Sequence, residues 1–434
     1  MEFLAYSEYK HSGVEWLGEV PKHWDVVRFG KIFDENKRKN LGMKETNVLS
    51  LSYGNIKEKN IDDNKGLLPE SFETYQIIEP NDIVFRFTDL QNDKRSLRNA
   101  ISKFHGIITS AYISVKTQQN SDFYNYLFRA YDLKKVFYSM GDGMRQSLKM
   151  DELNRMPVVL PSINEQNQIA QFLDKETAKI DELIAKQEQL ITLLEEQRKS
   201  VISYAVTKGL NPNVPMKDSG VEWLGEVPEH WQVLQLKQVA IGFTNGTTAE
   251  QMSENFSVYK VSRIESISQG VIDYEKVGYL PNNYNLEKFK LNKNDFLISH
   301  INSFDKVGNS AMYDGREVLY HGMNLIRFTP ISINPIFMGY FIKTESFLYQ
   351  LKRVCKPAVN QVSLTSFYIK SARITFPPVD EQNQIAQFLD KETAKIDELI
   401  QKQQELITQL KEYRSSVISY AVTGKIDVRG LGLV

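Results

Sequence analysis

The sequence predicts two mixed α/β (α+β) domains, separated by a pair of long antiparallel coiled-coil helices in an internal pseudo-two-fold repeat. Two duplications lead to this prediction. The twenty-residue block EQNQIAQFLDKETAKIDELI occurs without a difference at residues 165–184 and 381–400. The segment SGVEWLGEVPKHW at residues 12–24 returns at 219–231, with Glu229 in place of Lys22. The chain is therefore one unit written twice, with dissimilar sequence between the repeated blocks.

The duplicated blocks divide the chain into five segments. Each predicted helix is bounded by a proline and a glycine, Pro161 and Gly209 for the first and Pro378 and Gly424 for the second. The segments are a first domain at 1–162, a first long helix at 163–208, a second domain at 209–378, a second long helix at 379–424 and a C-terminal tail at 425–434.

Both long helices have the heptad pattern of a coiled coil, with apolar residues at alternating steps of four and three. A helix of about 40 residues rises about 60 Å, which is too long for its apolar stripe to be buried on one small domain. We therefore expect the two copies to pair with each other. A single chain places its globular halves at opposite ends of such a pair only if the helices run antiparallel, which creates a pseudo-two-fold axis. The alternatives are separate partners for each helix or an intermolecular coil. The predicted seam consists of Ile169, Leu173, Ile180, Leu183, Leu190, Leu194, Val201, Ile385, Leu389, Ile396, Leu399, Leu406, Leu410 and Val417.

The variable halves have the same order of expected elements. In the first half, residues 72–87 and 106–116 have the β-branched and aromatic content of strands, and residues 122–140 form an amphipathic helical pattern. In the second half, 291–301 and 318–330 are expected strands and 335–354 is an expected helix. The same order of expected elements in both halves, formed by different residues, is typical of two homologous modules of different specificity.

Composition points to a soluble cytoplasmic protein. No apolar run reaches the roughly 18 residues of a membrane span, and the chain does not begin with a secretion leader. Cys355 is the only cysteine, so no disulfide can form within the chain, and we interpret it as a packing residue.

Basic charge is concentrated in the variable segments, although the whole chain has a net charge of −1. Segments 1–162 and 208–378 carry net charges of +1 and +3, whereas 163–207 and 379–434 carry −3 and −2. Arg reads guanine, Asn and Gln read adenine, and Lys or Arg neutralises phosphate. The alternative is that these loops are only solvated surface. The candidate DNA-binding residues are Arg86, Thr88, Lys94, Arg95, Arg98, Ser110, Tyr112, Arg145, Gln146, Ser299, His300, Asn302, Lys306, His321, Asn324, Asn360 and Gln361.

The sequence lacks familiar catalytic motifs. Gly424-Lys425 is followed by Ile426, so it does not form a phosphate-binding loop. Pro377-Pro378 follows Phe376 rather than the Asn or Asp that precedes paired prolines in adenine methyltransferases. No cysteine or histidine lies at ligand spacing beside His300 or His321, so we expect no metal site. These observations predict a chain without catalytic residues.

The ordered combination of GVEWLGEVPxHW at the start of each half, Glu-Gln at the start of each helix and IAxFLDxxTAKIDxLI within it resembles the specificity subunit of type I restriction-modification enzymes. The resemblance covers essentially the whole chain. It implies two target-recognition domains, each of which reads one half of a bipartite, asymmetric double-stranded DNA sequence, with the helices as a spacer. It also implies that the chain docks two modification subunits and, through them, restriction subunits. The chain itself is then expected to have no catalytic activity.

The same resemblance implies that S-adenosylmethionine, ATP and Mg²⁺ bind to those partner subunits and that this chain binds no cofactor. No base-reading residue can be transferred by motif, so the candidates above rest on side-chain chemistry alone. The remaining alternative is a non-catalytic coiled-coil adaptor for another ligand. A self-contained restriction enzyme is less favoured, because this length does not accommodate a nuclease and a cofactor site.

Overall fold

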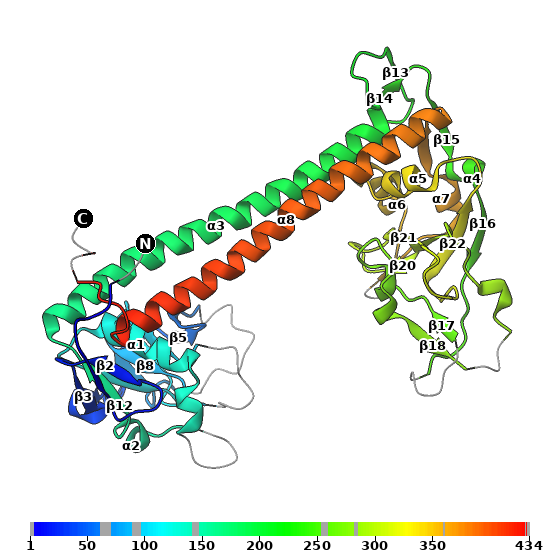
Figure 1. Cartoon of the computed structure of the whole chain (residues 1–434). Helices are drawn as coiled ribbons and strands as arrows, with labels where there is room; N and C mark the ends of the chain where they lie inside the picture. The colour runs from blue at the N-terminus through cyan, green and yellow to red at the C-terminus, as the bar shows by residue number, and fades with distance from the viewer. Residues whose placement is uncertain are drawn as a thin grey trace. The chain divides into compact units, whose positions relative to one another are not determined.

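The computed structural model describes residues 4–60, 71–88, 97–140, 147–252, 259–281, 285–358, 361–429 and 431. The chain divides into two compact units (Figure 1). Unit 1 comprises Met1–Glu188 and Gln404–Val434, and unit 2 comprises Gln189–Gln403. Each unit therefore combines one variable half with one end of each long helix.

The two long helices, α3 (Ile163–Lys208) and α8 (Val379–Val422), are continuous over 46 and 44 residues. In unit 1, Arg414 Nε of α8 lies 2.9 Å from Asp181 Oδ1 of α3. In unit 2, Arg198 Nε of α3 lies 2.9 Å from Asp397 Oδ1 of α8. The late part of each helix thus meets the early part of the other, and the predicted antiparallel pairing is confirmed.

The buried line along the helices differs from the predicted seam near their middles. Much of that seam is buried, including Ile169, Leu173, Ile385 and Leu389. The exceptions, with exposed fractions of 38–45%, are Leu183, Leu190, Leu399 and Leu406. A straight α-helix has 3.6 rather than 3.5 residues per turn, so its contact line moves from one heptad position to the next. The neighbouring Ile407, which is 8% exposed, lies on the shifted line, and the seam assignment of those four leucines is corrected accordingly.

Unit 1 is built on a four-stranded antiparallel sheet of order β4-β11-β8-β9. Two-stranded pairs surround it: β1 with β2, β3 with β12, β5 with β6, and β7 with β10. The strands are β1 (Tyr9–His11), β2 (Glu19–Pro21), β3 (Asp25–Arg28), β4 (Asp34–Glu35), β5 (Leu49–Ser52), β6 (Asn55–Glu58), β7 (Gln76–Ile78), β8 (Ile83–Phe85), β9 (Asn99–Ile101), β10 (Gly106–Ile108), β11 (Ile113–Lys116) and β12 (Pro157–Leu160). The helices are η1 (Phe29–Lys31), α1 (Ser121–Leu133), η2 (Val136–Ser139) and α2 (Met150–Leu153).

Unit 2 has an equivalent four-stranded sheet of order β16-β22-β19-β21. Its strands are β13 (Met216–Asp218), β14 (Glu226–Pro228), β15 (Gln232–Gln235), β16 (Ala240–Asn245), β17 (Tyr259–Val261), β18 (Gly278–Leu280), β19 (Phe296–Ser299), β20 (Ile301–Asn302), β21 (Ser310–Met312), β22 (Leu325–Pro330), β23 (Lys356–Ala358), β24 (Gln361–Ser363) and β25 (Arg373–Phe376). Its helices are α4 (Leu236–Val239), η4 (Glu265–Ile267), η5 (Tyr274–Lys276), η6 (Glu287–Phe289), α5 (Pro335–Phe341), α6 (Glu345–Lys352) and α7 (Ser366–Ser371).

The two sheets share one topology, because β4, β11, β8 and β9 correspond in chain order and pairing to β16, β22, β19 and β21. The pairs β3-β12 and β15-β25 also correspond. This agreement between dissimilar sequences confirms the prediction of two mixed α/β modules.

Several predicted elements are shorter in the structure than in the sequence pattern. Asn81 (φ 74°) interrupts the expected strand 72–87, and Lys135 (φ 60°) interrupts the expected helix 122–140. Non-glycine residues rarely adopt this left-handed conformation, and it ends a regular strand or helix. The expected helix 335–354 is likewise divided into α5 and α6, and Thr344 caps the start of the second by accepting from Phe347 N.

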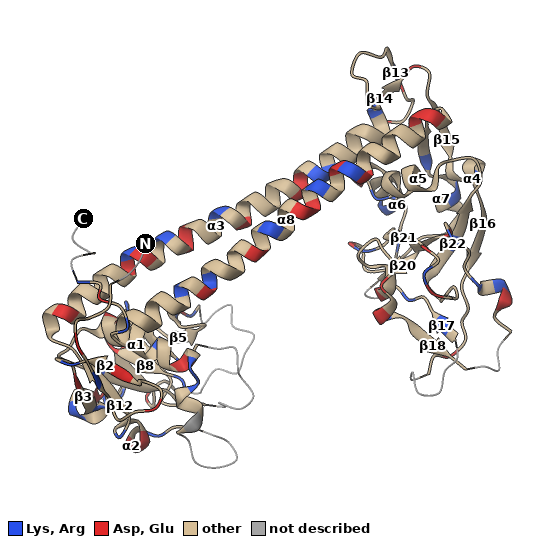
Figure 2. Ribbon diagram, in the orientation of Figure 1, with Lys and Arg blue, Asp and Glu red and all other residues tan. Residues whose placement is uncertain are grey.

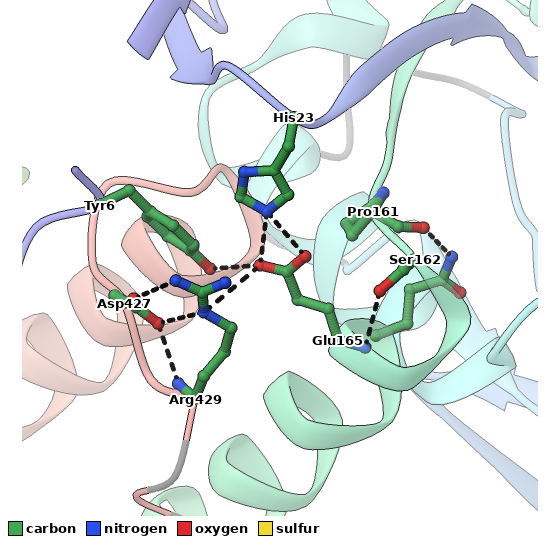
Figure 3. A network of polar contacts seen from close by, with 8 residues as sticks. Tyr6, His23, Pro161, Ser162, Glu165, Asp427 and Arg429 are labelled. Carbon is green, nitrogen blue, oxygen red and sulfur yellow. Dashed lines mark hydrogen bonds and ion pairs between the residues drawn. The ribbon is translucent and has the colours of Figure 1, made fainter. Parts of the chain in front are cut away.

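The two ends of the chain meet in unit 1, at the start of α3 (Figure 3). Asp427 N donates to Leu4 O at 2.7 Å. Tyr6 Oη donates to Glu165 Oε1 at 2.9 Å, and His23 Nε2 lies 3.1 Å from Glu165 Oε2. We call Tyr6, His23, Glu165, Asp427 and Arg429 the terminal clasp.

Glu165 is the centre of the terminal clasp and is only 3% exposed. Arg429 Nε lies 4.0 Å from Glu165 Oε1 and donates to Asp427 Oδ1 at 2.9 Å. Burial, followed by the Glu165 carboxylate, raises the pKa of Tyr6 far above its usual value, so the phenol stays a hydrogen-bond donor. The clasp therefore joins the first and last segments of the chain to one buried carboxylate.

Unit 2 has a simpler version of the same contact. Glu381, the counterpart of Glu165, accepts from Trp231 Nε1 at 2.9 Å and lies 2.6 Å from His230 Nε2. Here the connection from α3 to β13 is continuous chain. At the corresponding place in unit 1, between α8 and β1, the terminal clasp brings the two terminal segments together.

Candidate nucleic-acid interface

Candidate residues from three separate segments of unit 2 come together at the end of β19. Asn302 of β20 pairs with Val362 of β24, next to Gln361. His300 N donates to Asn324 O at 3.2 Å. β23, which pairs with β24, completes a three-stranded sheet. We call β20, β24 and β23 the small sheet of unit 2.

The side chains of these candidates differ in their access to a ligand. Lys306 and Gln361 are exposed, and His300, Asn302 and Asn324 are half-buried. These five lie where a nucleic acid could reach at least part of each side chain.

Two candidates of unit 2 are instead fully buried. Ser299 has no exposed surface, and its Oγ accepts from Asn302 Nδ2 at 3.1 Å. His321 also has no exposed surface, and its Nε2 lies 3.0 Å from Leu325 O. Burial argues against a direct base contact by either side chain, so we reassign both to packing.

A basic cluster that the sequence analysis did not select lies beside the small sheet. Lys352 Nζ donates to Asp305 O at 3.1 Å and lies 5.7 Å from the centroid of the Phe304 ring. Arg353 and Lys356 are exposed on the segment that enters β23. The sequence signal for this cluster is the basic pair Lys352-Arg353 at the end of the expected helix, followed by Lys356.

In unit 1 the structure describes only part of the candidate set. Arg86 and Thr88 are half-buried at the end of β8, and Ser110 is exposed and Tyr112 half-buried in the turn between β10 and β11. The predictions for Lys94, Arg95, Arg145, Gln146 and, in unit 2, Asn360 fall outside the described residues.

Arg98 requires a correction. Its side chain is fully buried, Nη1 donates to Thr88 O at 3.0 Å and the backbone N donates to Asp132 Oδ2 at 2.9 Å. A guanidinium in this position holds Thr88, which follows β8, close to the start of β9, and its burial argues against a direct DNA contact. The sequence could not distinguish it from an exposed arginine, because the carboxylate that accepts from it lies on α1.

Each variable domain is joined to a long helix by the same set of hydrogen bonds. In unit 1, Asn120 N donates to Gln166 Oε1 at 3.0 Å, and Asn120 Nδ2 donates to Asn167 Oδ1 at 2.7 Å. Tyr126 Oη donates to Asp174 Oδ1 at 2.8 Å. Asn120 also caps α1 through its Oδ1, so one residue fixes both helices.

Unit 2 repeats this joint. Asn334 N and Nδ2 donate to Gln382 Oε1 and Asn383 Oδ1, both at 2.7 Å. Tyr340 Oη donates to Asp390 Oδ1 at 2.8 Å. Since the helix residues belong to the duplicated block, the two joints let different domains be held in the same way.

Charged groups of both signs are interspersed along α3 and α8 (Figure 2). Among the residues that the structure describes, no three His, Cys, Asp or Glu side chains gather as metal ligands. No described helix has the length and apolar character needed to cross a bilayer.

Protonation of His321 is expected to weaken unit 2 in mild acid. Burial lowers the pKa of His321 to about 4, whereas a histidine in an unfolded chain titrates near pH 6.5. The unfolded chain therefore takes up the proton first. The stability of unit 2 should be constant above about pH 6.5 and fall by up to about 3 kcal/mol as the pH drops towards 4.

Urea unfolding of the protein at several pH values measures this loss. His321→Asn should flatten the dependence only in part, because burial lowers the pKa of His300 in the same direction. His11→Asn, at an exposed position of unit 1, is the control and should leave the pH dependence unchanged. If the stability of His321→Asn falls with pH as much as that of the wild type, the assignment of this effect to His321 is contradicted.

Comparison with known proteins agrees with this architecture. The family model described as the type I restriction modification DNA specificity domain matches residues 21–193 and 228–409. The chain belongs to this family. Each match covers most of one variable domain and much of the long helix that follows it, so the family unit occurs twice.

Relatives extend the comparison to the whole chain. The type I restriction enzyme MjaVIII specificity subunit of Methanocaldococcus jannaschii is 25% identical over 426 residues, which is 95% of each protein. The putative MjaX specificity subunit of the same organism is 38% identical over 171 residues, which is 38% of this chain and only 40% of that protein.

A solved structure gives the same result for the fold. A chain from a study of complex assembly and conformational transition in the type I R-M system has a TM-score of 0.67 and 14% identity. The match covers 93% of this chain and 98% of that chain, and at this identity it shows the fold alone.

Proposed function

We propose that this protein is the DNA-recognition subunit of a type I restriction-modification complex, in which each unit reads one part of a bipartite, asymmetric target. The observation that supports this most is the repeated joint: one sheet topology is held on the same helix residues in both units, while the segments that carry the base-reading candidates differ. Two different recognition domains held on the same helical framework suit a DNA target made of two different short sequences, or words.

We further propose that α3 and α8 dock two modification subunits and, through them, the restriction subunits. The identical twenty-residue block includes solvent-exposed pairs such as Gln171 and Gln387, whose identity folding does not require. Exposed apolar residues also recur at seven-residue multiples on both helices: Leu183, Leu190 and Tyr204, and Leu399, Leu406 and Tyr420. A stripe repeated on two helices suits two copies of one partner.

In this proposal the chain contributes recognition and no catalytic group. S-adenosylmethionine, ATP and Mg²⁺ belong to the partner subunits, and the complex acts in the cytoplasm. The units determine which sequence is bound, and the methyl transfer takes place on the modification subunits.

Exchange of one variable segment tests the function. In the test chimera, residues 29–156, between β3 and β12, replace residues 236–372, between β15 and β25. Both units then carry the same reader, so the methylated target should change from two unlike words to an inverted repeat of one word. Mapping of methylated adenines in cells that also produce the modification subunits measures the change.

The reciprocal chimera is the matched control and should give an inverted repeat of the other word. An asymmetric target that survives in both chimeras would refute the assignment of one word to each unit.

A further inference from the structure

A short turn between β20 and β21 displays an aromatic ring to solvent. Phe304 is 54% exposed. The turn is ordered by its own hydrogen bonds, since Lys306 N and Val307 N both donate to Ser303 O at 3.0 Å, and Ser303 N donates to Asn302 Oδ1 at 2.8 Å. The exposure of Phe304 is therefore a property of a well-defined turn.

The turn is also fixed to the rest of unit 2. Val307 is fully buried, and Gly308 N donates to Ser299 O at 2.8 Å. Gly308 has φ +86°, and a Cβ at this position would lie 3.0 Å from Leu348 Cδ2 of α6. Lys352 Nζ holds the tip through Asp305 O at 3.1 Å. The ring is thus presented on a rigid support, which limits the entropy lost when it binds.

Basic residues lie near Phe304 in the chain and on the paired strands of the small sheet. Segments 300–309 and 350–358, which the small sheet joins, contain four basic residues and one acidic residue. Lys352 Nζ lies 5.7 Å from the Phe304 ring centroid, and Lys306, Arg353 and Lys356 are exposed. An exposed aromatic ring beside one lysine, with three exposed basic residues on the same two segments, fits a polyanion that carries flat apolar groups. Duplex DNA supplies both, as phosphates and as bases.

We propose that Phe304 enters the base stack of the DNA word read by unit 2, while Lys306, Lys352, Arg353 and Lys356 bind the phosphates around it. An apolar wedge of this kind separates two base pairs, and the aromatic face replaces part of the lost stacking. Bases differ in how readily their steps open, so the wedge adds selectivity at the step that it enters. The inference rests on the proposed DNA-recognition function and names a residue that carries out part of it.

Fluorescence of 2-aminopurine tests the insertion directly. The complex of this chain with its modification subunits is titrated with duplexes that carry the analogue at successive positions of the word read by unit 2. Wild type should raise the fluorescence at one step, where the neighbouring base is unstacked. Phe304→Ala should abolish that signal and weaken binding roughly tenfold or more, and Phe304→Trp should retain both.

Ile331→Ala is the matched control. Ile331 is 53% exposed and lies outside the small sheet, so its truncation removes a similar exposed apolar group and should change neither signal nor affinity. A Phe304→Ala complex that binds with wild-type affinity and keeps the signal would overturn the inference and leave the proposed function standing.

Two other outcomes would also overturn the inference. If Phe304→Ala impairs association with the modification subunits in gel filtration and keeps the fluorescence signal, the ring contacts protein instead of DNA. If the wild-type complex selects no bipartite target, the proposed function fails and the inference fails with it.

Discussion

Deletion of one heptad from each long helix should shorten the unread gap of the DNA target and leave both words unchanged. The matched segments are residues 185–191 of α3 and 401–407 of α8, which occupy equivalent places in the two copies. Seven helical residues correspond to about 10.5 Å of rise, or at most about 3 base pairs of B-DNA. The words should persist, because both joints and both variable domains lie outside the deleted segments.

Methylation-site mapping in cells that produce the modification subunits measures this change. Deletion of residues 185–191 alone is the control: it makes α3 one heptad shorter than α8, so the Asp181–Arg414 and Arg198–Asp397 pairs cannot both form, and it should reduce the yield of folded protein. New words with an unchanged gap after the double deletion would contradict the spacer role of the helices.

Glu165→Ala should destabilise unit 1 far more than Glu381→Ala destabilises unit 2. The first substitution leaves the buried Tyr6 hydroxyl without its acceptor and removes the carboxylate beside His23 and Arg429. Leaving buried groups unpaired in this way costs about 2–4 kcal/mol, a figure reduced here because His23 and Arg429 are half-exposed. At Glu381, whose side chain is 35% exposed, the loss should be about 1–2 kcal/mol.

Hydrogen exchange during urea titration separates the two effects, since amides of each unit report on that unit. Glu165→Gln is the second variant: it keeps the size of the side chain and an acceptor for Tyr6, so it should recover part of the loss. Equal destabilisation of both units by the two alanine variants would show that the terminal clasp adds nothing to the contact that unit 2 also has.

The long helices were predictable from sequence because their signal is local. Ile169, Leu173 and their duplicates at Ile385 and Leu389 recur at helical spacing, and burial follows that spacing directly. The finer position of the buried line was not predictable, because Leu183 and Ile184 are both apolar and only the accumulated twist of the helix decides between them.

The candidate interface was only partly predictable, because it depends on contacts between distant segments. The pairing of Asn302 with Val362 joins residues 60 positions apart, and no periodic pattern in the sequence predicts it. Arg98 and His321 have the chemistry of DNA contacts but are buried by elements elsewhere in their units. Conversely, phenylalanine is a residue type typical of a protein core, but Phe304 is exposed.

The hydrogen-bonded joints between the variable domains and the long helices could also not be predicted from the sequence. Asn120 and Asn334 lie six residues before Tyr126 and Tyr340, and the sequences between them differ. Two shared residues in a dissimilar background do not stand out in one sequence. Their meaning becomes clear only when both pairs are seen to bind the same three helix positions.

The meeting of both termini in unit 1 has a consequence for protein synthesis. A ribosome releases residues in order, and unit 2, which consists of Gln189–Gln403, has all its parts before translation ends. Unit 1 also needs Gln404–Val434, which is translated after all of unit 2. The first 188 residues, which are synthesised before unit 2, therefore complete their own core only after unit 2 has emerged, through contacts with residues such as Val417 and Ile418.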